Sequence, residues 1–277
     1  DAAWTTVSME STLTCNSSAA FFSWFALSFE SFSQLETIIA KVLYYEKEPY
    51  LSQTNWYNKS VMVGDASTSG SSCVHTKRYI KEMMDDYVPN MNITEVYSGN
   101  YDSQMSTNIN NGVTYFNYRG YYGMSNFNNT DINNLNNGLM LPFAVFLTCD
   151  TGTFTNGTCR SEAFIRAGTA SNQKGAIAAI GTATTGTHTT FNNCVDAGIF
   201  YGVFVDQLYT PGAALVRGKL HLYETFPQNP SNKVDIFSYW NNVMGDPSVE
   251  LWTSEPKSLT VNYDNNIAVG TNYLEVT

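Results

Sequence analysis

The sequence predicts an α/β fold in which a mostly parallel sheet is flanked by helices. Apolar segments of strand length alternate along the chain with segments whose apolar residues repeat at helical spacing. The strand candidates that begin near Val61, Phe143 and Ala176 are apolar on both faces, as in a sheet that helices cover on two sides. A chain of 277 residues can form one large domain of this class with a small appendage.

Each helix is predicted from its apolar spacing and its end signals. A helix over about 31–46, ended by Pro49, carries an apolar stripe made of Leu35, Ile38, Ile39, Val42 and Leu43. We expect further helices over about 72–87, 103–110, 161–167 and 193–206, and one from Pro211 through Leu222. The strands between them are predicted at 60–63, 93–97, 113–118, 143–148 and 175–181.

The two ends of the chain differ from this alternating part. Residues 1–28 have no assignable structure, and a chain that starts at Asp1 without a signal peptide is expected to be a piece of a longer precursor. After Gly245-Asp-Pro247, the segments 249–252, 258–263 and 273–277 alternate as strands do. We therefore expect a main domain over 29–255, followed at 256–277 by the opening strands of a β-sandwich.

Charge and composition exclude several classes of partner. Lys and Arg number 14 against 24 Asp and Glu, and a net charge of −10 argues against nucleic acid, whose phosphates need clustered cations. The longest apolar runs, 141–149 and 197–205, are shorter than the roughly 18–20 residues of a membrane span. Charged residues make up only 14% of the chain, so amides and hydroxyls supply most of its polarity. This balance is typical of a secreted or cell-surface protein, and several Asn-x-Ser/Thr triplets are consistent with export.

The cysteines do not have the spacing of a metal site. Five are scattered along the chain, and we expect neither a metal nor a cofactor. With Cys149 set aside, the other four allow three disulfide connectivities: Cys15, Cys73, Cys159 and Cys194.

The candidate site lies where the parallel strands end, since ligands of open α/β sheets collect at the carboxyl edge. Cys149 directly follows the apolar strand 143–148, and backbone N–H groups beside it could receive an oxyanion. Asp150 and Gly152 form this turn, and Gly120 follows the preceding strand. The alternative is a buried structural cysteine, or one bridged to Cys159.

Several motifs together resemble those of the gingipain-like cysteine peptidases, in the same order from about Phe29 to Trp252. They are Asn117-Tyr-Arg-Gly-Tyr-Tyr-Gly123, Thr148-Cys-Asp-Thr-Gly-Thr-Phe154, Ser161-Glu-Ala-Phe164, Gly175-Ala-Ile-Ala-Ala-Ile180 and Gly245-Asp-Pro247. The resemblance implies a caspase-like α/β fold followed by an immunoglobulin-like module, with Cys149 at the position of the nucleophile. It implies protein or peptide substrates, and other extracellular domains of the same longer protein as partners.

One position departs from the family pattern. The family has Gly-His-Gly after this strand, with the histidine as general base, whereas this chain has Gly120, Tyr121 and Tyr122. A phenol ordinarily ionises only near pH 10, so a tyrosine is a poor acceptor for a thiol proton at neutral pH. The base position is therefore degenerate at Tyr121.

His188 is the predicted replacement for the missing base. The strand 175–181 should neighbour the Cys149 strand, and the Thr/Gly loop 182–187 could bring His188 back over the thiol. The alternative is a solvent-exposed loop histidine. His75 and His221 are less suitable, because both fall within predicted helices away from Cys149.

Two other groups have open interpretations. Tyr118, Tyr121, Tyr122 and Phe127 could form an aromatic lip that binds peptide or glycan, or could pack against the C-terminal module. Asp150 could orient a base or a substrate cation, or could cap the turn before the helix that begins near Ser161. Asp65 could ligate a cation, although no calcium-loop spacing surrounds it.

Two functions follow from these residues. The first is a secreted or cell-surface cysteine endopeptidase with Cys149 as nucleophile and a non-standard base, His188. The second is a catalytically inactive pseudo-peptidase that serves as an extracellular structural, adhesion or assembly domain. They differ in whether a proton acceptor reaches Cys149.

Overall fold

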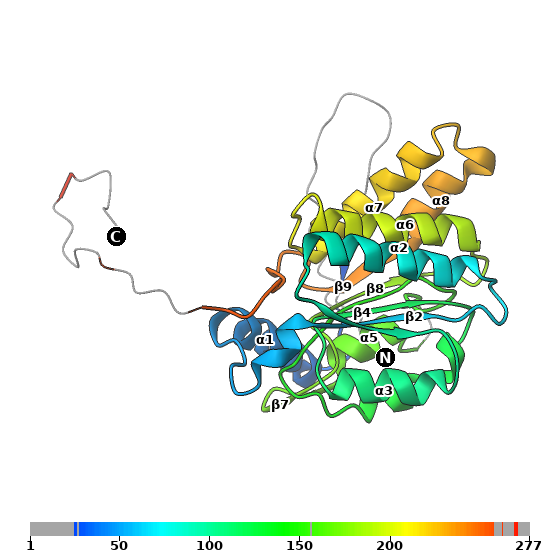
Figure 1. Ribbon diagram of the computed structural model, residues 1–277. Helices are drawn as coiled ribbons and strands as arrows, with labels where there is room; N and C mark the ends of the chain where they lie inside the picture. Colours follow the sequence, from blue (N-terminus) through cyan, green and yellow to red (C-terminus); the bar gives the residue numbers. More distant parts are fainter. Residues whose placement is uncertain (1–24, 27, 156, 258–261, 263–268, 271–277) are drawn as a thin grey trace.

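The core of the protein is a seven-stranded, mostly parallel sheet (Figure 1). The computed structural model describes residues 25–26, 28–155, 157–257, 262 and 269–270. The strand order is β1-β9-β8-β5-β4-β2-β3. Strands β3, β2, β4, β5 and β8 run parallel, β9 is antiparallel to β8, and β1 is parallel to β9. Their bounds are Phe25–Ala26 (β1), Lys59–Gly64 (β2), Asn92–Val96 (β3), Tyr115–Arg119 (β4), Phe143–Phe146 (β5), Ala178–Thr182 (β8) and Asn241–Gly245 (β9).

Helices cover both faces of this sheet. In Figure 1, α2, α6, α7 and α8 lie on one side, and α1, α3 and α5 lie on the other. The helix bounds are Phe32–Lys47 (α1), Ser72–Tyr87 (α2), Tyr101–Asn110 (α3), Asn129–Asn133 (α4), Arg160–Arg166 (α5), Thr189–Phe204 (α6), Pro211–Thr225 (α7) and Lys233–Trp240 (α8). Short 3₁₀ turns span Thr54–Asn58, Met124–Asn126 and Pro230–Asn232, and a small hairpin pairs β6 (Gly168–Thr169) with β7 (Asn172–Gln173).

Two hydrophobic clusters explain why the central strands are apolar on both faces. One cluster joins Met62, Val145 and Ile180 of the sheet to α2, α6 and α7. The other joins Phe116 and Phe146 to α1, α3 and α5. Because successive residues of a strand point to opposite faces, a sheet covered on both sides needs apolar residues at nearly every position.

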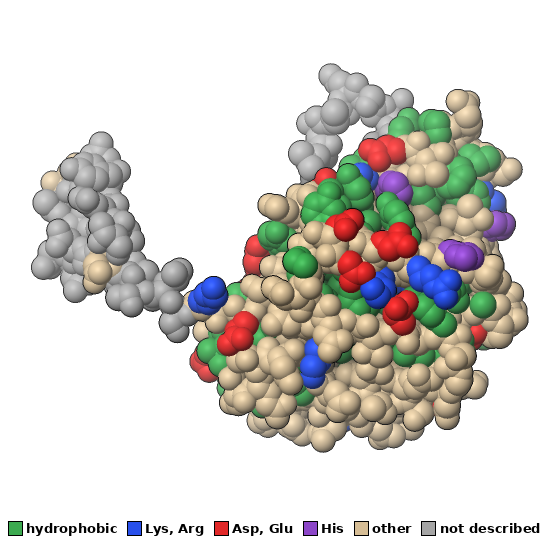
Figure 2. All heavy atoms as spheres, in the orientation of Figure 1, with side chains coloured by type: hydrophobic (Ala, Val, Ile, Leu, Met, Phe, Trp, Pro, Cys, Tyr) green, Lys and Arg blue, Asp and Glu red, His purple; other side chains and the backbone are tan. Residues whose placement is uncertain are grey.

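The predicted fold class is confirmed, and the helices and strands expected over 31–222 form within a few residues of their expected bounds. Local signals set several ends: Ser31 Oγ accepts a hydrogen bond from Gln34 N at 3.3 Å at the start of α1, and Pro211 is the first residue of α7. On the face shown in Figure 2, charged side chains gather over α2, while neutral polar groups dominate elsewhere. Within the described residues no helix combines the length and hydrophobicity needed to cross a bilayer.

The C-terminal part differs from the expectation in two respects. The helix α8 and the strand β9 were not predicted, and the expected strand 249–252 is irregular chain. Val249 and Leu251 are buried, so their alternation reflects packing, and Leu251 N donates to Tyr209 O at 2.7 Å. The predicted strands 258–263 and 273–277, and with them most of the expected β-sandwich, lie outside the described residues.

Candidate active site

Cys149 lies at the carboxyl edge of the sheet, on the loop that follows β5. This loop is tied to the end of the neighbouring strand β8, since Gly152 N donates to Thr182 O at 3.1 Å and Asp150 N donates to Thr184 O at 2.7 Å. The pairing of β5 with β8 confirms that the strand of Cys149 and the strand before the Thr/Gly loop are neighbours. The loops that follow these two strands therefore meet above the sheet edge.

The thiol of Cys149 is nearly buried and faces one hydroxyl. Its exposed fraction is 8%, and its Sγ lies 2.9 Å from Thr187 Oγ1. In the part of the chain that the structure describes, no imidazole or carboxylate hydrogen-bonds to this sulfur. Cys149 is also unpaired, as are Cys73, Cys159 and Cys194, so the bridge to Cys159 does not form. Cys15 lies outside the described residues.

The turn after Cys149 is built for close packing. Asp150 has a left-handed φ of 65°, and Thr151 Oγ1 accepts a hydrogen bond from Thr182 N at 3.0 Å. A Cβ at Gly152 would lie 2.8 Å from Asn242 Oδ1 and 2.9 Å from the backbone of Gly181, so only glycine fits there. Since the N–H groups of Asp150 and Gly152 already donate to carbonyls, these two residues serve the turn. Among the described residues, Cys149 N–H and Gly120 N–H have no backbone acceptor.

His188 follows Thr187 directly, and its side chain caps α6. Its Nδ1 accepts a hydrogen bond from Thr190 N at 3.2 Å, and its ring lies with its edge toward Phe191. A neutral imidazole has one acceptor nitrogen, and in this conformation Thr190 occupies it. His188 is exposed, and its acceptor nitrogen is engaged with the helix.

Tyr121, which the sequence resemblance assigns to the base position, is exposed. Tyr121 and Tyr122 are 52% and 53% exposed, whereas Tyr118 and Phe127 are fully buried. The predicted aromatic lip is therefore reduced to Tyr121 and Tyr122. Gly120 is required where the chain leaves β4, because a Cβ there would lie 2.2 Å from the hydroxyl of Tyr118.

Asp65 holds this tyrosine loop in place from the end of β2. Ser125 Oγ donates to Asp65 Oδ2 at 2.5 Å, and Tyr118 Oη lies 2.9 Å from Ser125 Oγ. Burial alone would raise the pKa of Asp65, but the hydrogen bonds from Ser125 and Ser67 outweigh it and lower that pKa below its ordinary value. The carboxylate is thus surrounded by hydroxyls. Within the described residues, no three side chains of His, Cys, Asp or Glu gather as metal ligands would.

A buried polar network beneath the site was missed by the sequence analysis. Arg119, 1% exposed, donates to Leu147 O, to Thr189 O at 3.3 Å and to Asn193 Oδ1 at 2.8 Å. It thereby joins the loop before Cys149 to the start of α6 after Thr187. The signal that could have revealed it is the occurrence of Asn117 and Arg119 in a strand that is otherwise apolar.

An ion pair continues this network between α2 and α6. Lys77 and Asp196 contact each other, and both side chains are 0% exposed. Asn117 of β4 bridges them, because its Oδ1 accepts from Lys77 and its Nδ2 donates to Asp196 Oδ1 at 2.8 Å. The pair anchors α6, which begins two residues after Thr187, the residue that faces Cys149.

The remaining candidates lie away from the thiol or have other roles. His75 is exposed on α2, and His221 on α7 has its Nδ1 3.8 Å from Glu224. Asp150 does not cap α5, since Cys159 is the N-cap residue and its backbone N–H donates to Glu162 at 2.8 Å.

The sequence model of peptidase family C25 matches residues 27–252. The chain belongs to peptidase family C25. Gingipain R2 from two strains of Porphyromonas gingivalis is 23% identical over 268 residues, which cover 89% of this chain and 35% of that protein. The chain therefore spans about a third of the length of these curated relatives.

Solved structures show the same fold. The Arg-specific cysteine proteinase gingipain R (RGPB) superposes with a TM-score of 0.77 at 22% identity, over 90% of this chain and 60% of that one. A complex of the pro- and mature domains of Porphyromonas gingivalis RgpB gives a TM-score of 0.78 at 22% identity, over 90% of this chain and 61% of that one. This C25 domain thus has the caspase-like fold that the sequence motifs implied.

Proposed function

We propose that this C25 domain is a pseudo-peptidase, which binds polypeptide at the Cys149 edge of the sheet and does not hydrolyse it. The observation that carries the proposal is the surroundings of the thiol. Cys149 Sγ faces the hydroxyl of Thr187, and the position of the family base holds the exposed Tyr121. Such a domain would act outside the cell in adhesion or assembly, consistent with a surface rich in amides and hydroxyls.

The chemistry of the thiol explains why this arrangement is unsuited to hydrolysis. Attack on a carbonyl needs the thiolate, so the proton must move to an acceptor within hydrogen-bond reach. A neutral threonine hydroxyl is a far weaker base than an imidazole. Since a positioned general base contributes about 10²- to 10⁴-fold to a rate, its absence leaves turnover slower by about that factor.

A second candidate function rests on one further contact. Because Thr187 touches the thiol, the backbone of His188 lies directly beside the site. A rotation that releases His188 Nδ1 from Thr190 N would free the acceptor nitrogen, at about the 1 kcal/mol of a lost N-cap. Under this hypothesis the domain is a secreted cysteine endopeptidase with a relocated dyad, Cys149 and His188.

The deciding experiment measures the rate of Cys149 alkylation against pH. The wild-type chain is compared with His188→Ala, and Cys149→Ala identifies the signal of this thiol. The proposal expects a rate that rises only above about pH 8 and is the same in both proteins, as for a thiol without a base. A fast rate that persists down to about pH 6 and disappears in His188→Ala would refute it and support the dyad.

A gain-of-function variant tests whether the absence of a general base is what prevents hydrolysis. Tyr121→His restores an imidazole at the base position and replaces an exposed side chain, so it should not disturb the core. We expect this variant to cleave a mixed peptide library that the wild-type chain leaves intact. Equal cleavage by the wild-type chain, lost in Cys149→Ala, would show that the native site is already active.

A further inference from the structure

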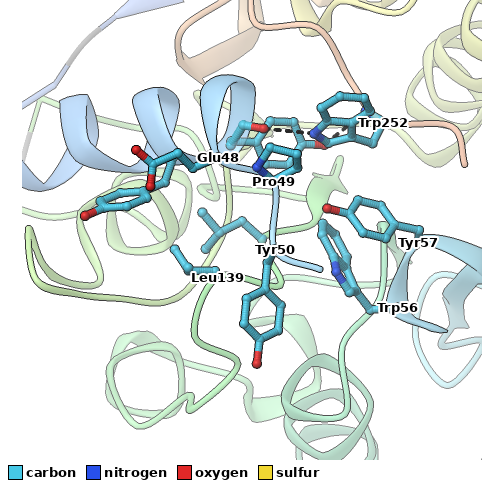
Figure 3. Close-up of a pocket in the computed structure, with 10 residues that line it drawn as sticks. Glu48, Pro49, Tyr50, Trp56, Tyr57, Leu139 and Trp252 are labelled. Atoms are coloured by element: carbon cyan, nitrogen blue, oxygen red, sulfur yellow. Dashed lines mark hydrogen bonds between the residues drawn. The ribbon is translucent and has the colours of Figure 1, made fainter. Parts of the chain in front are cut away.

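An aromatic cleft lies at the opposite edge of the sheet from Cys149 (Figure 3). Trp56 and Tyr57 precede β2, so they stand at the amino ends of the strands, whereas Cys149 stands at the carboxyl ends. The C-terminal end of α1 and the residues after it supply Tyr44, Glu48, Pro49 and Tyr50. The lining is completed by Tyr45, Leu139, Leu141 and Trp252.

Two buried polar groups in this cleft have no hydrogen-bond partner in the described part of the chain. They are the indole N–H of Trp56, whose side chain is 1% exposed, and the hydroxyl of Tyr57, which is 0% exposed. A buried donor left unpaired is rare in folded proteins and strongly unfavourable, so each calls for an acceptor. Trp252 differs, because its indole N–H donates to Tyr45 O at 2.9 Å.

The cleft has room for an acceptor at this point. About 210 Å³ between the lining side chains is free of atoms, including space open to solvent, and it has room for about one oxygen-sized atom in contact with the walls. In Figure 3 the indole nitrogen of Trp56 and the hydroxyl of Tyr57 both lie on the side of their rings that faces Pro49 and Tyr50. The unpaired groups therefore point into the cleft.

We propose that this cleft binds an extended, proline-containing peptide segment that carries a basic residue. The interior presents the indole N–H and the phenol O–H of two aromatic side chains, and it favours a ligand with acceptors and no donors. The carbonyl before a proline is such a group, because a proline has no backbone N–H that would be left unpaired in an apolar cleft. Flat proline rings also pack well against aromatic walls in the polyproline conformation.

Two further observations favour this ligand. Burial, together with the nearby Glu255, raises the pKa of Tyr57 to about 12, so its hydroxyl stays protonated and able to donate at neutral pH. The exposed carboxylates of Glu48 and Glu255 provide negative charge at the rim, although Lys47 and Lys257 adjoin them in sequence. A sugar suits the interior less well, since each of its hydroxyls brings a donor of its own.

The test is a titration of the full chain with a proline-rich probe, followed by NMR of ¹⁵N-labelled indole groups. The probe is a peptide of four Pro-Pro-Leu repeats followed by one terminal Arg. We expect it to shift the indole resonance of Trp56, which Trp56→Phe identifies. Tyr57→Phe keeps the ring and should weaken binding about three- to tenfold, the loss of one hydrogen bond. Tyr79→Phe, an exposed tyrosine of α2, should leave binding unchanged.

Charge reversal supplies a second measurement that does not depend on the buried groups. Glu48 lies on the surface. We expect Glu48→Lys to weaken binding of the Arg-containing probe and to leave binding of the same peptide with a terminal Gln unchanged. The proposal is overturned if millimolar probe leaves the Trp56 resonance unmoved, or if Tyr57→Phe binds as tightly as the wild-type chain. It is also overturned if maltoheptaose shifts that resonance and the peptide does not.

Discussion

Replacing Asp196 by Asn tests whether the buried ion pair holds α6 against the sheet beneath the thiol. The substitution keeps the shape of the side chain and removes its charge. Both oxygens of Asp196 accept hydrogen bonds, Oδ2 from Lys77 and Oδ1 from Asn117. An amide offers only one oxygen, so its NH₂ group would face a donor in either orientation.

The expected destabilisation follows from burial. Lys77 and Asp196 are both 0% exposed, and breaking a fully buried pair by removing one partner lowers the free energy of unfolding by about 3–5 kcal/mol. For a domain of this size, that corresponds to a fall in Tm of about 6–20 °C. The matched control is Asp85→Asn in the exposed pair Lys81–Asp85 of α2, which should lower stability by less than about 1 kcal/mol.

The pH dependence of the folding stability gives a second test of this ion pair. Burial lowers the pKa of Lys77 from 10.5 to about 8, although Asp196 favours the charged form. Between pH 8 and 10.5 the unfolded chain therefore binds more protons at this lysine than the folded chain, and the stability of the wild type rises with pH. Without Asp196 the pKa of Lys77 falls further, so in the variant this rise begins below pH 8. The difference in stability between Asp196→Asn and the wild type should then shrink between pH 7 and 8, by about 1 kcal/mol at most.

Urea unfolding at pH 7, 8 and 9 measures both quantities. A deficit below about 1 kcal/mol at pH 7, or one that grows toward pH 8, would refute the reasoning. The double variant Lys77→Met/Asp196→Leu should recover part of the lost stability, because apolar side chains of similar size need no charge partner, while the buried Asn117 Oδ1 loses its donor Lys77.

Three other predictions concern the same edge of the sheet. A lysine in place of Arg119 cannot reach Leu147 O, Thr189 O and Asn193 Oδ1 together. We therefore expect Arg119→Lys to lower the free energy of unfolding in urea by about 1–3 kcal/mol and to make alkylation of Cys149 faster. Gly152→Ala should destabilise by about 1–3 kcal/mol, because its Cβ meets backbone, whereas Gly186→Ala meets nothing within 4 Å and should leave Tm unchanged. Burial raises the pKa of both Cys73 and Cys159, the latter to about 12 with a contribution from Glu162, so peptide mapping should find both unmodified by iodoacetamide at pH 8.

The fold was predictable for the strands that are buried on both faces, because their burial is visible as a run of apolar residues. Helices on both faces require strands such as β2, β5 and β8 to be apolar at nearly every position, and that run is visible in the sequence. Strand β9 has no such apolar run, because it begins with two asparagines. Both are buried, and each makes a side-chain hydrogen bond: Thr182 Oγ1 donates to Asn241 Oδ1 at 2.7 Å, and Asn242 Nδ2 donates to Gly152 O at 3.1 Å. Such partners lie 59 and 90 residues away, and local pattern does not reveal them.

The sequence predicted which loops meet at the candidate site, but not which hydrogen bonds their side chains form there. Consecutive parallel strands usually pair, so the loop after β8 was expected near Cys149, and Thr187 does reach the thiol. The side chain of His188 depends on a local competition: the free N–H groups at the start of α6 attract its Nδ1 toward Thr190. The role of Arg119 depends on contacts up to 74 residues away, which only the folded chain brings together.

The features that hold Cys149 in place are independent of the features that would activate it. The Gly152–Gly181 contact, the hydrogen bonds of Thr151 and the buried Arg119 fix the loop through packing and backbone pairing, and none of them accepts a proton from the thiol. A chain that lost its base could therefore keep this loop intact, since stability alone would maintain it. The presence of a well-ordered cysteine is then weak evidence for catalysis. Tyr121 and His188 are the informative positions, because both are exposed and each carries a group that could exchange a proton with the thiol.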